Sequence, residues 1–308
     1  MNIQQLEYIV AVDRLKHFAK AAAACNVTQP TLSMMIQKLE EELNVEIFDR
    51  SKSPVSTTSI GEVLVNQAKV ILFNVGQMRE IASVNRNSIT GALRLSIIPT
   101  VAPYLLPKLF TQLREYLPDL KCRVSEMRTD VIIERLRNAE IDLAILSTPL
   151  DIPSLLEIPI YFERFMAYVS PDEELYKKVE ITGEDLQMEK LWVLEEGHCF
   201  RAQILNICHK ENISRQQYEA GSIQNLVKVV DLNGGYTLIP ELHLENLSPE
   251  QLKNVRRFAG NEPRREISLV FRQDFVRERL LNEMVNCIKN IIPEDMMDER
   301  LSKFRVKL

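Results

Sequence analysis

The alternation of strand-like and helix-like segments after Gly91 limits the possible folds more than any other feature of this sequence. Strand-like runs at 93–98, 121–126 and 141–146 are separated by segments with helical apolar spacing at 105–113 and 131–138. This order indicates an α/β architecture with parallel strands. The alternation continues to about residue 290, and segments near 163–168 and 265–270 are suited to cross between two lobes. We therefore expect a two-lobed domain over residues 89–308, with lobe I at 89–163 and 269–308 and lobe II at 164–268.

The first 58 residues show a different pattern, in which three helices precede two short strands. Helices are expected at 3–13 and 18–24, and a third begins after Thr28, a good N-cap, with Pro30 in its first turn. The third helix carries one buried stripe at spacings of 4, 3 and 4, formed by Leu32, Ile36, Leu39 and Leu43. Strands at 47–50 and 55–57 around the turn 51–54 form a wing. Residues 1–58 are thus predicted to be a winged helix-turn-helix domain.

A long helix is expected to follow, capped by Thr58 or Ser59 and ending near Asn85. Its apolar residues recur at alternating spacings of 4 and 3, at Leu64, Ala68, Ile71, Val75, Met78 and Ala82. This spacing is typical of a coiled-coil seam, although it spans fewer than three full heptads. We interpret 59–88 as a linker helix through which two copies pair.

The N-terminal half of the third helix offers a polar outward face that suits the major groove of DNA. The residues placed to contact bases or phosphates are Gln29, Pro30, Thr31, Ser33, Met34 and Gln37. In the wing, Arg50 and Lys52 are placed to contact phosphates. Charge gives no support, because the net charge is −5 and residues 1–60 hold six Lys/Arg against seven Asp/Glu. A three-helix domain with a purely structural role is the alternative.

The sequence also bears on the compartment. No apolar run is long enough to span a bilayer, and the opening residues lack the features of a secretory signal. We therefore expect a cytoplasmic protein, in which the five cysteines are normally reduced and any disulfide is transient, catalytic or sensory. The histidines, at positions 17, 198, 209 and 243, are scattered. We predict neither a metal site nor a bound cofactor.

Cys199 stands apart from the other cysteines. It follows the strand 192–194 and the turn 195–197, at the start of an expected helix. A helix N-terminus stabilises a thiolate, as would a protonated His198 and Arg201 one turn further on, whereas Glu195 and Glu196 act in the opposite direction. The three cysteines at 25, 122 and 287 lie in apolar patterns and are expected to be small buried side chains.

Cys208 is the candidate partner for Cys199, nine positions further along the chain. If the intervening segment is helical, the two Cα atoms lie about 13 Å apart at a rise of roughly 1.5 Å per residue. A disulfide requires Cα atoms within about 7 Å. Bond formation would therefore have to unwind or relocate this segment, which would turn a chemical event into a change of shape.

The N-terminal 60 residues resemble the LysR-type transcription regulators. The residues that carry the resemblance are Phe18-Ala19-x-Ala21-Ala22, Val27 through Ser33, Ile36, Leu39-Glu40, Leu43-x-Val45-x-x-Phe48-x-Arg50 and Thr58-x-x-Gly61. Ser53 and the pair Met34-Met35 depart from the usual pattern. The expected fold is an N-terminal all-α winged helix-turn-helix with a long linker helix, followed by an α/β two-lobed periplasmic-binding-protein-like effector domain. The resemblance implies dimers or tetramers bound to dyad-symmetric double-stranded DNA.

A longer resemblance points to the peroxide-sensing members of that family. It is carried by Leu194 through Gln203 with Cys208, by Ile98 through Pro107, and by Pro263 through Val270. The resemblance implies that Cys199 attacks hydrogen peroxide to give a sulfenic acid and that Cys208 then forms a disulfide with it. Hydrogen-bond donors for the released hydroxide would be Thr100, Thr129, His198 and Arg265, at a cleft between the lobes. Gln217 falls where some relatives have a histidine.

The function expected from this resemblance is a peroxide-activated switch for antioxidant genes. Its partners would be double-stranded DNA, RNA polymerase and a thiol reductant such as glutaredoxin or thioredoxin. One alternative is a LysR-type regulator that responds to a small anionic metabolite in the cleft, with both cysteines structural. A thiol peroxidase enzyme is a second alternative, but a fused DNA-binding domain would give such an enzyme no purpose.

Overall fold

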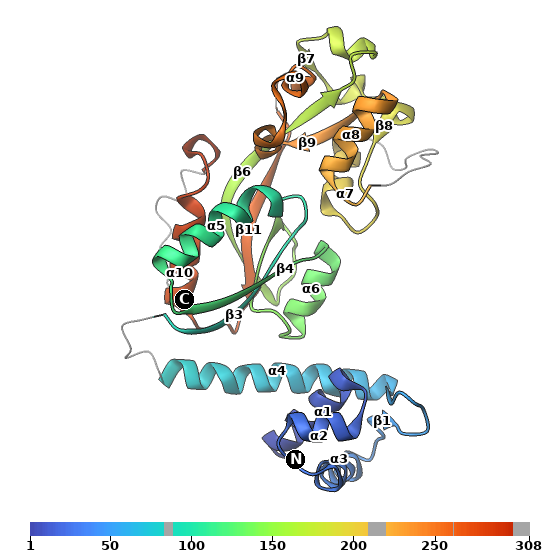
Figure 1. The fold of residues 1–308 in the computed structure, drawn as a ribbon, viewed down its shortest axis with the longest axis vertical. Helices are drawn as coiled ribbons and strands as arrows, with labels where there is room; N and C mark the ends of the chain where they lie inside the picture. Colours follow the sequence, from blue (N-terminus) through green and yellow to red (C-terminus); the bar gives the residue numbers. More distant parts are fainter. Residues whose placement is uncertain (83–88, 209–219, 261, 298–308) are drawn as a thin grey trace. The chain divides into compact units, whose positions relative to one another are not determined.

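The computed structural model describes residues 1–82, 89–208, 220–260 and 262–297 (Figure 1). The chain divides into two compact units. The first contains the N-terminal helices together with the short segments 137–140 and 274–277, and the second contains the rest of the chain from residue 88. The predicted boundaries after residues 58 and 88, and those of the two lobes, remain predictions.

The first unit contains the three expected helices, α1 (Ile3–Leu15), α2 (Phe18–Ala24) and α3 (Gln29–Leu43). Asn2 and Gln5 form a reciprocal capping box at the start of α1, and the Thr28 side chain accepts from the Thr31 amide at the start of α3. Three stripe residues of α3 are fully buried: Leu32, Ile36 and Leu39. The fourth, Leu43, is exposed at the end of the helix.

The wing and the long helix follow as expected. Strand β1 (Phe48–Asp49) pairs antiparallel with β2 (Ser56–Thr57), and α4 (Ser59–Ala82) begins directly after them. Thr58 is the N-cap of α4, because its hydroxyl accepts from the Gly61 amide at 3.0 Å. A Cβ at Gly61 would lie 2.1 Å from the Ile47 carbonyl oxygen, so only glycine allows this close approach. The expected end of the helix near Asn85 lies outside the described residues.

Lobe I of the second unit contains the predicted parallel strands, in the order β4-β3-β5. These are β3 (Gly91–Ile97), β4 (Leu120–Glu126) and β5 (Leu143–Thr148). Helices α5 (Ala102–Tyr116) and α6 (Thr129–Arg137) connect them on opposite faces of the sheet, and α10 (Glu278–Lys289) packs beside α5 (Figure 1).

Two long strands, β6 (Leu155–Val169) and β11 (Arg264–Arg272), run through both lobes and pair antiparallel. They include the expected crossover segments. Strand β11 also pairs antiparallel with β5, so the expectation of a parallel sheet is corrected to a mixed one. The register places Arg265 directly opposite Glu163, and this pair defines the junction between the lobes.

Lobe II contains shorter elements around a second core. Its strands are β7 (Glu180–Ile181), β8 (Leu191–Trp192), β9 (Tyr236–Pro240) and β10 (Val255–Phe258). Its α-helices are α7 (Cys199–Ile207), α8 (Ile223–Asn233) and α9 (Pro249–Leu252). In the described part of the second unit, short 3-10 helices lie at Glu174–Lys177, Gly183–Asp185, Met188–Lys190, Glu241–Asn246 and Glu294–Met296. Within the described ranges, no helix is both long and apolar enough to cross a membrane.

Candidate functional site

Cys199 is the first residue of α7, as the sequence predicts. The residue before it, His198, has extended backbone and gives the helix no side-chain cap. The positive end of the helix dipole is therefore left to act on whatever lies beside the first turn. Cys199 is partly exposed, and all five cysteines are thiols rather than disulfides.

The loop before the helix is held in place by two arginines. Arg201 donates to the Leu194 carbonyl at 2.9 Å, and Arg128 donates to the Glu196 carbonyl at 3.3 Å. Gly197 has a φ of +89°, and a Cβ there would lie 2.7 Å from Nε of Arg128. A glycine is therefore required where the loop turns past the arginine and into α7.

Arg265, in β11, is a buried side chain with several hydrogen-bond partners. Its guanidinium is 2% exposed and contacts Oε1 of Glu163 through Nε at 2.7 Å and Nη2 at 2.5 Å. The far end of the same fork donates to the Thr100 hydroxyl at 2.8 Å and to the Thr100 carbonyl at 3.0 Å. The face of the guanidinium lies 4.9 Å from the centre of the Phe200 ring, in the first turn of α7.

The Arg265 cation interacts electrostatically with the groups around it, including the Cys199 thiol. Burial acts to lower the pKa of Arg265, but Glu163, Tyr161 and the Cys199 thiol raise it, and the net direction is upward. For Glu163, burial raises the pKa, while the Arg265 charge opposes that effect. A permanently cationic guanidinium in two short contacts keeps the carboxylate ionised. Arg265 thus holds Thr100 through two hydrogen bonds and packs against Phe200, the residue directly after Cys199.

His198 is 7% exposed, and its Nε2 lies 3.7 Å from Oε1 of Glu195. Burial lowers the pKa of His198, although Glu195 acts to raise it. The ring is therefore mainly neutral near pH 7, and it can offer a hydrogen bond rather than the positive charge considered from the sequence.

Four side-chain atoms are buried without a hydrogen-bond partner among the described residues: the Thr129 hydroxyl, the Tyr161 hydroxyl, Oε2 of Glu163 and Oε1 of Gln203. Thr129 is the first residue of α6, and Gln203 lies in the middle of α7, where its Nε2 donates to the Ser147 hydroxyl at 2.8 Å. Buried polar groups are normally satisfied, so atoms of this kind mark a place where a small polar molecule can bind. Gln217 lies outside the described residues.

Cys208 is at the other end of α7, where it caps the helix. Its side chain is 4% exposed and belongs to the hydrophobic core of lobe II. The helix is intact from Cys199 to Ile207, so a separation of about 13 Å along its axis follows from the roughly 1.5 Å rise per residue. Of the three cysteines expected to be buried, Cys287 is buried, whereas Cys25 and Cys122 are partly exposed. Burial raises the pKa of both Cys122 and Cys287 to about 11, which fits inert thiols.

The structure places most of the predicted DNA-contacting residues on one exposed face of α3. Gln29, Pro30, Thr31 and Gln37 are exposed, Met34 is 50% exposed, and Ser33 is partly buried. Two side chains already have partners, because the Thr31 hydroxyl lies 2.8 Å from that of Thr28 and Gln37 donates to Glu41 at 3.0 Å.

The two wing cations are engaged within the first unit. Arg50 contacts Glu40 at 2.5 Å, and the second oxygen of Glu40 accepts from the amides of Ile47 and Phe48. Lys52 lies 3.3 Å from Asp49. Glu40 therefore fastens α3 to the wing through Arg50. Both cations would have to exchange an acidic partner for a phosphate in order to contact DNA.

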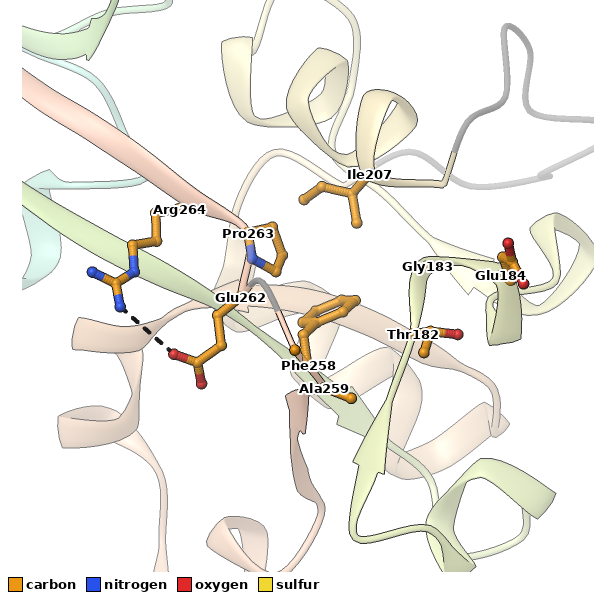
Figure 2. Close-up of a pocket in the computed structure, with 10 residues that line it drawn as sticks. Thr182, Gly183, Glu184, Ile207, Phe258, Ala259, Glu262, Pro263 and Arg264 are labelled. Atoms are coloured by element: carbon orange, nitrogen blue, oxygen red, sulfur yellow. Dashed lines mark ion pairs between the residues drawn. The ribbon is translucent and has the colours of Figure 1, made fainter.

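A separate pocket of about 890 Å³ lies in lobe II. Figure 2 shows Arg264 and Glu262, 3.8 Å apart, on one side of it and Ile207, from the end of α7, on another. It contains none of the predicted site residues. In the part of the chain that the structure describes, no group of three acidic, histidine or cysteine side chains is arranged to hold a metal ion.

Comparison with known protein families assigns the class. The family described as "Bacterial regulatory helix-turn-helix protein, lysR family" matches residues 3–62, and "LysR substrate binding domain" matches residues 86–291. The second match covers more than half of the chain. The protein therefore belongs to the LysR family, and it is a transcription regulator rather than an enzyme.

Within this family, the chain is similar to proteins named for peroxide regulation. The "Hydrogen peroxide-inducible genes activator" of Haemophilus influenzae is 36% identical over 88% of this chain and 91% of its own length. The "DNA-binding transcriptional dual regulator OxyR" of Escherichia coli is 34% identical over 88% and 90%. A solved full-length OxyR variant from Pseudomonas aeruginosa is 32% identical, with a TM-score of 0.78 over 94% of this chain and 98% of that one. The predicted family and fold class are confirmed.

Proposed function

We propose that this protein is a DNA-binding transcription activator that is switched on by hydrogen peroxide through Cys199 and Cys208. One observation carries the proposal: the residue directly after a thiol at a helix N-terminus packs against a buried arginine that also holds Thr100, with a second thiol at the far end of the same helix. The relatives named for peroxide induction support the same assignment.

In the first chemical step, the Cys199 thiolate attacks one oxygen of hydrogen peroxide. An S–O bond forms, the O–O bond breaks, the sulfur loses two electrons, and the second oxygen leaves as hydroxide, which takes up a proton to become water. In the second step, the Cys208 thiol condenses with the sulfenic acid, so that an S–S bond forms and water leaves.

Thr100, Thr129 and His198 are the proposed donors to the leaving oxygen. The Thr100 hydroxyl accepts from Arg265, so its own proton is directed away from the guanidinium and is available to the peroxide. The Thr129 hydroxyl is buried without a partner among the described residues, and the neutral His198 ring can donate from one nitrogen.

The second step requires α7 to unwind, because its helical form holds the two cysteines too far apart to bond. Unwinding removes Cys208 from the core of lobe II and breaks the contact from Gln203 to Ser147 in β5. We propose that this rearrangement changes how subunits associate and how they contact promoter DNA.

The remaining partners follow from the same proposal. The α3 residues named above, together with Arg50 and Lys52 of the wing, would contact dyad-symmetric sites as part of a homodimer or homotetramer, and RNA polymerase would be recruited there. A protein that works in the cytoplasm would be reset by a thiol reductant such as glutaredoxin or thioredoxin.

Thiol mass spectrometry tests this function. Equimolar peroxide is expected to convert Cys199 and Cys208 to a disulfide and to change the DNA footprint, whereas Cys199→Ser gives no oxidation and Cys208→Ser stops at the sulfenic acid. Cys287→Ser is the matched control and should behave like the wild type. If the wild-type protein keeps both thiols after peroxide, the proposed function is wrong.

Regulation by a small anionic metabolite is less well supported. Arg265 is the buried cation at the junction of the lobes, and both ends of its fork are occupied by Glu163 and Thr100. An anion would have to displace a carboxylate that already forms two short contacts with it. Wild-type protein that ignores peroxide but is stabilised by an organic acid would favour this alternative.

A further inference from the structure

Glu163 is a carboxylate in a place where the sequence gives no reason to expect one. It lies in the middle of the apolar strand β6, is completely buried, and faces Arg265 across the antiparallel pair with β11. A buried ion pair of this kind is costly, and well-packed apolar residues often stabilise a fold as well or better. Stability alone therefore does not explain why these two residues are charged.

The carboxylate makes its short contacts with Arg265. One oxygen, Oε1, receives both Nε and Nη2 of the guanidinium, while Oε2 is buried with no hydrogen-bond partner among the described residues. Because Glu163 contacts the Nε and Nη2 edge of the Arg265 guanidinium, the plane of that group cannot rotate freely. The end of the fork is then directed at Thr100, and the face of the plane lies against Phe200.

Phe200 extends this arrangement to the thiol. Its ring stacks on Phe165 at 5.0 Å, and it is the residue directly after Cys199 in α7. Thr100 precedes α5 in lobe I, and Phe200 belongs to lobe II. One immobilised guanidinium thus sets the position of the Thr100 hydroxyl relative to the first turn of α7.

We propose that Glu163 is a positioning residue for peroxide reduction, which acts by holding Arg265 in the orientation that aims the Thr100 O–H at the leaving oxygen. The inference rests on the proposed function, because it assigns Glu163 a role in the attack of the Cys199 thiolate on peroxide. Without Glu163, the guanidinium can rotate, Thr100 loses its fixed acceptor role, and its proton is no longer directed at the breaking O–O bond.

The role can be tested by comparing two reactions of the same thiol. Reduction of hydrogen peroxide needs both the Cys199 thiolate and stabilisation of the leaving hydroxide. Alkylation by iodoacetamide also needs the Cys199 thiolate, but its leaving group is iodide. A hydrogen bond from the Thr100 hydroxyl stabilises iodide only weakly. The ratio of the two rate constants therefore isolates leaving-group stabilisation, whereas general loosening of the fold changes both rates together.

In the full-length protein, Glu163→Leu is expected to lower this ratio by about tenfold or more, because misplacing one donor removes part of its effect on the reacting oxygen. Glu163→Gln keeps an oxygen that can accept from Arg265, and we expect it to retain the ratio to within about threefold. Glu157→Leu is the matched control in the same strand, since Glu157 accepts from the Leu150 amide rather than from Arg265. Its ratio should equal that of the wild type.

If Glu163→Leu does not fold, Glu163→Asp takes its place. The aspartate side chain is one methylene shorter, so its carboxylate lies further from Arg265. The ratio of the peroxide to the alkylation rate constant should therefore fall by several-fold. A folded Leu or Asp variant with an unchanged ratio would overturn the role of Glu163. If wild-type Cys199 itself reacts with peroxide no faster than Cys25 in the same chain, the proposed function fails instead, so the two failures are distinguishable.

Discussion

At the scale of single residues, the junction of the lobes contains buried ionisable side chains, some of which are charged and one of which is neutral. Arg265 and Glu163 remain charged because each supplies the other with a partner. His243 is 1% exposed and instead remains neutral, with its Nδ1 2.8 Å from the Tyr104 hydroxyl. Burial lowers the pKa of His243 to about 4. Burial is therefore compatible with ionisation where two opposite charges pair, and with loss of charge where the partner is a neutral hydroxyl.

His243 is predicted to make the protein less stable in mild acid. Its pKa is about 4 in the folded state and near 6.5 when exposed, so between these values the unfolded chain binds the proton and the folded chain does not. The free energy of unfolding should therefore fall as the pH falls from 6.5 to 4, by at most about 3 kcal/mol from this group.

Urea unfolding at several pH values measures the effect. His243→Gln keeps a polar partner for Tyr104 but cannot titrate, so its stability should depend less steeply on pH over this window. His17→Gln, which changes an exposed histidine, serves as the control. Equal slopes for wild type and His243→Gln would show that the pKa of His243 is the same in the folded and unfolded chain, and the prediction would be wrong.

At the scale of secondary structure elements, the spacing of apolar residues predicts whether a segment is a helix or a strand. It predicts less well which other elements that segment packs against. The alternation of segments correctly indicated the strands and helices of lobe I, because burial imposes the period of each element on its sequence. Strand direction across β6 and β11 was not predictable, because a buried strand has the same apolar pattern in either direction. Glu163 stands directly before Arg164 in an otherwise apolar run, so its charge did not mark it as buried, and its partner Arg265 is about a hundred residues away in the sequence.

Helix α4 shows the same limitation. Its 4,3 spacing predicted a seam for a second copy, yet Ala68 is 2% exposed, and Leu64 and Ile71 pack against the core of the first unit. Helix α1 is the partner of this stretch. Packing within one chain and pairing between two chains select the same spacing, so the pattern alone cannot distinguish them.

Helix α7 is predicted to control the rate of the disulfide step. Ala202 is exposed in this helix, and Ala202→Gly should weaken it by about 1 kcal/mol. If unwinding precedes the reaction of Cys208, disulfide formation should accelerate by about fivefold, while sulfenic acid formation is unchanged. Rapid quench with thiol mass spectrometry separates the two steps.

Lys228→Gly is the matched control, because Lys228 is exposed in α8, a helix of similar length that contains neither cysteine. It should destabilise lobe II to a similar extent without affecting the disulfide step. Acceleration by both glycine variants would mean that the cysteines meet through general opening of lobe II rather than through unwinding of α7.

At the scale of the whole molecule, the charge balance requires an explanation. The first 60 residues carry slightly more acid than base, and the wing cations are already paired with Glu40 and Asp49. One copy can therefore neutralise few phosphates, and phosphate neutralisation supplies most of the sequence-independent affinity for DNA. Two linked copies bind far more tightly than one, because the second contact is intramolecular. DNA binding by this chain should thus depend on self-association more than it does for a basic protein.

Met78, at 70% the most exposed large apolar side chain among the described side chains of α4, provides the test. If it packs against a second copy, Met78→Lys removes about 1.5 kcal/mol or more from each side of a two-fold interface and weakens the dimer roughly a hundredfold. Asn74→Lys adds the same charge one turn earlier, at an exposed polar position, and controls for any gain in phosphate attraction. Sedimentation and DNA titration should show Met78→Lys losing self-association and DNA affinity together, while Asn74→Lys keeps both. A Met78→Lys protein that dissociates yet binds DNA with full affinity would show that one copy suffices, and the inference from charge would then be wrong.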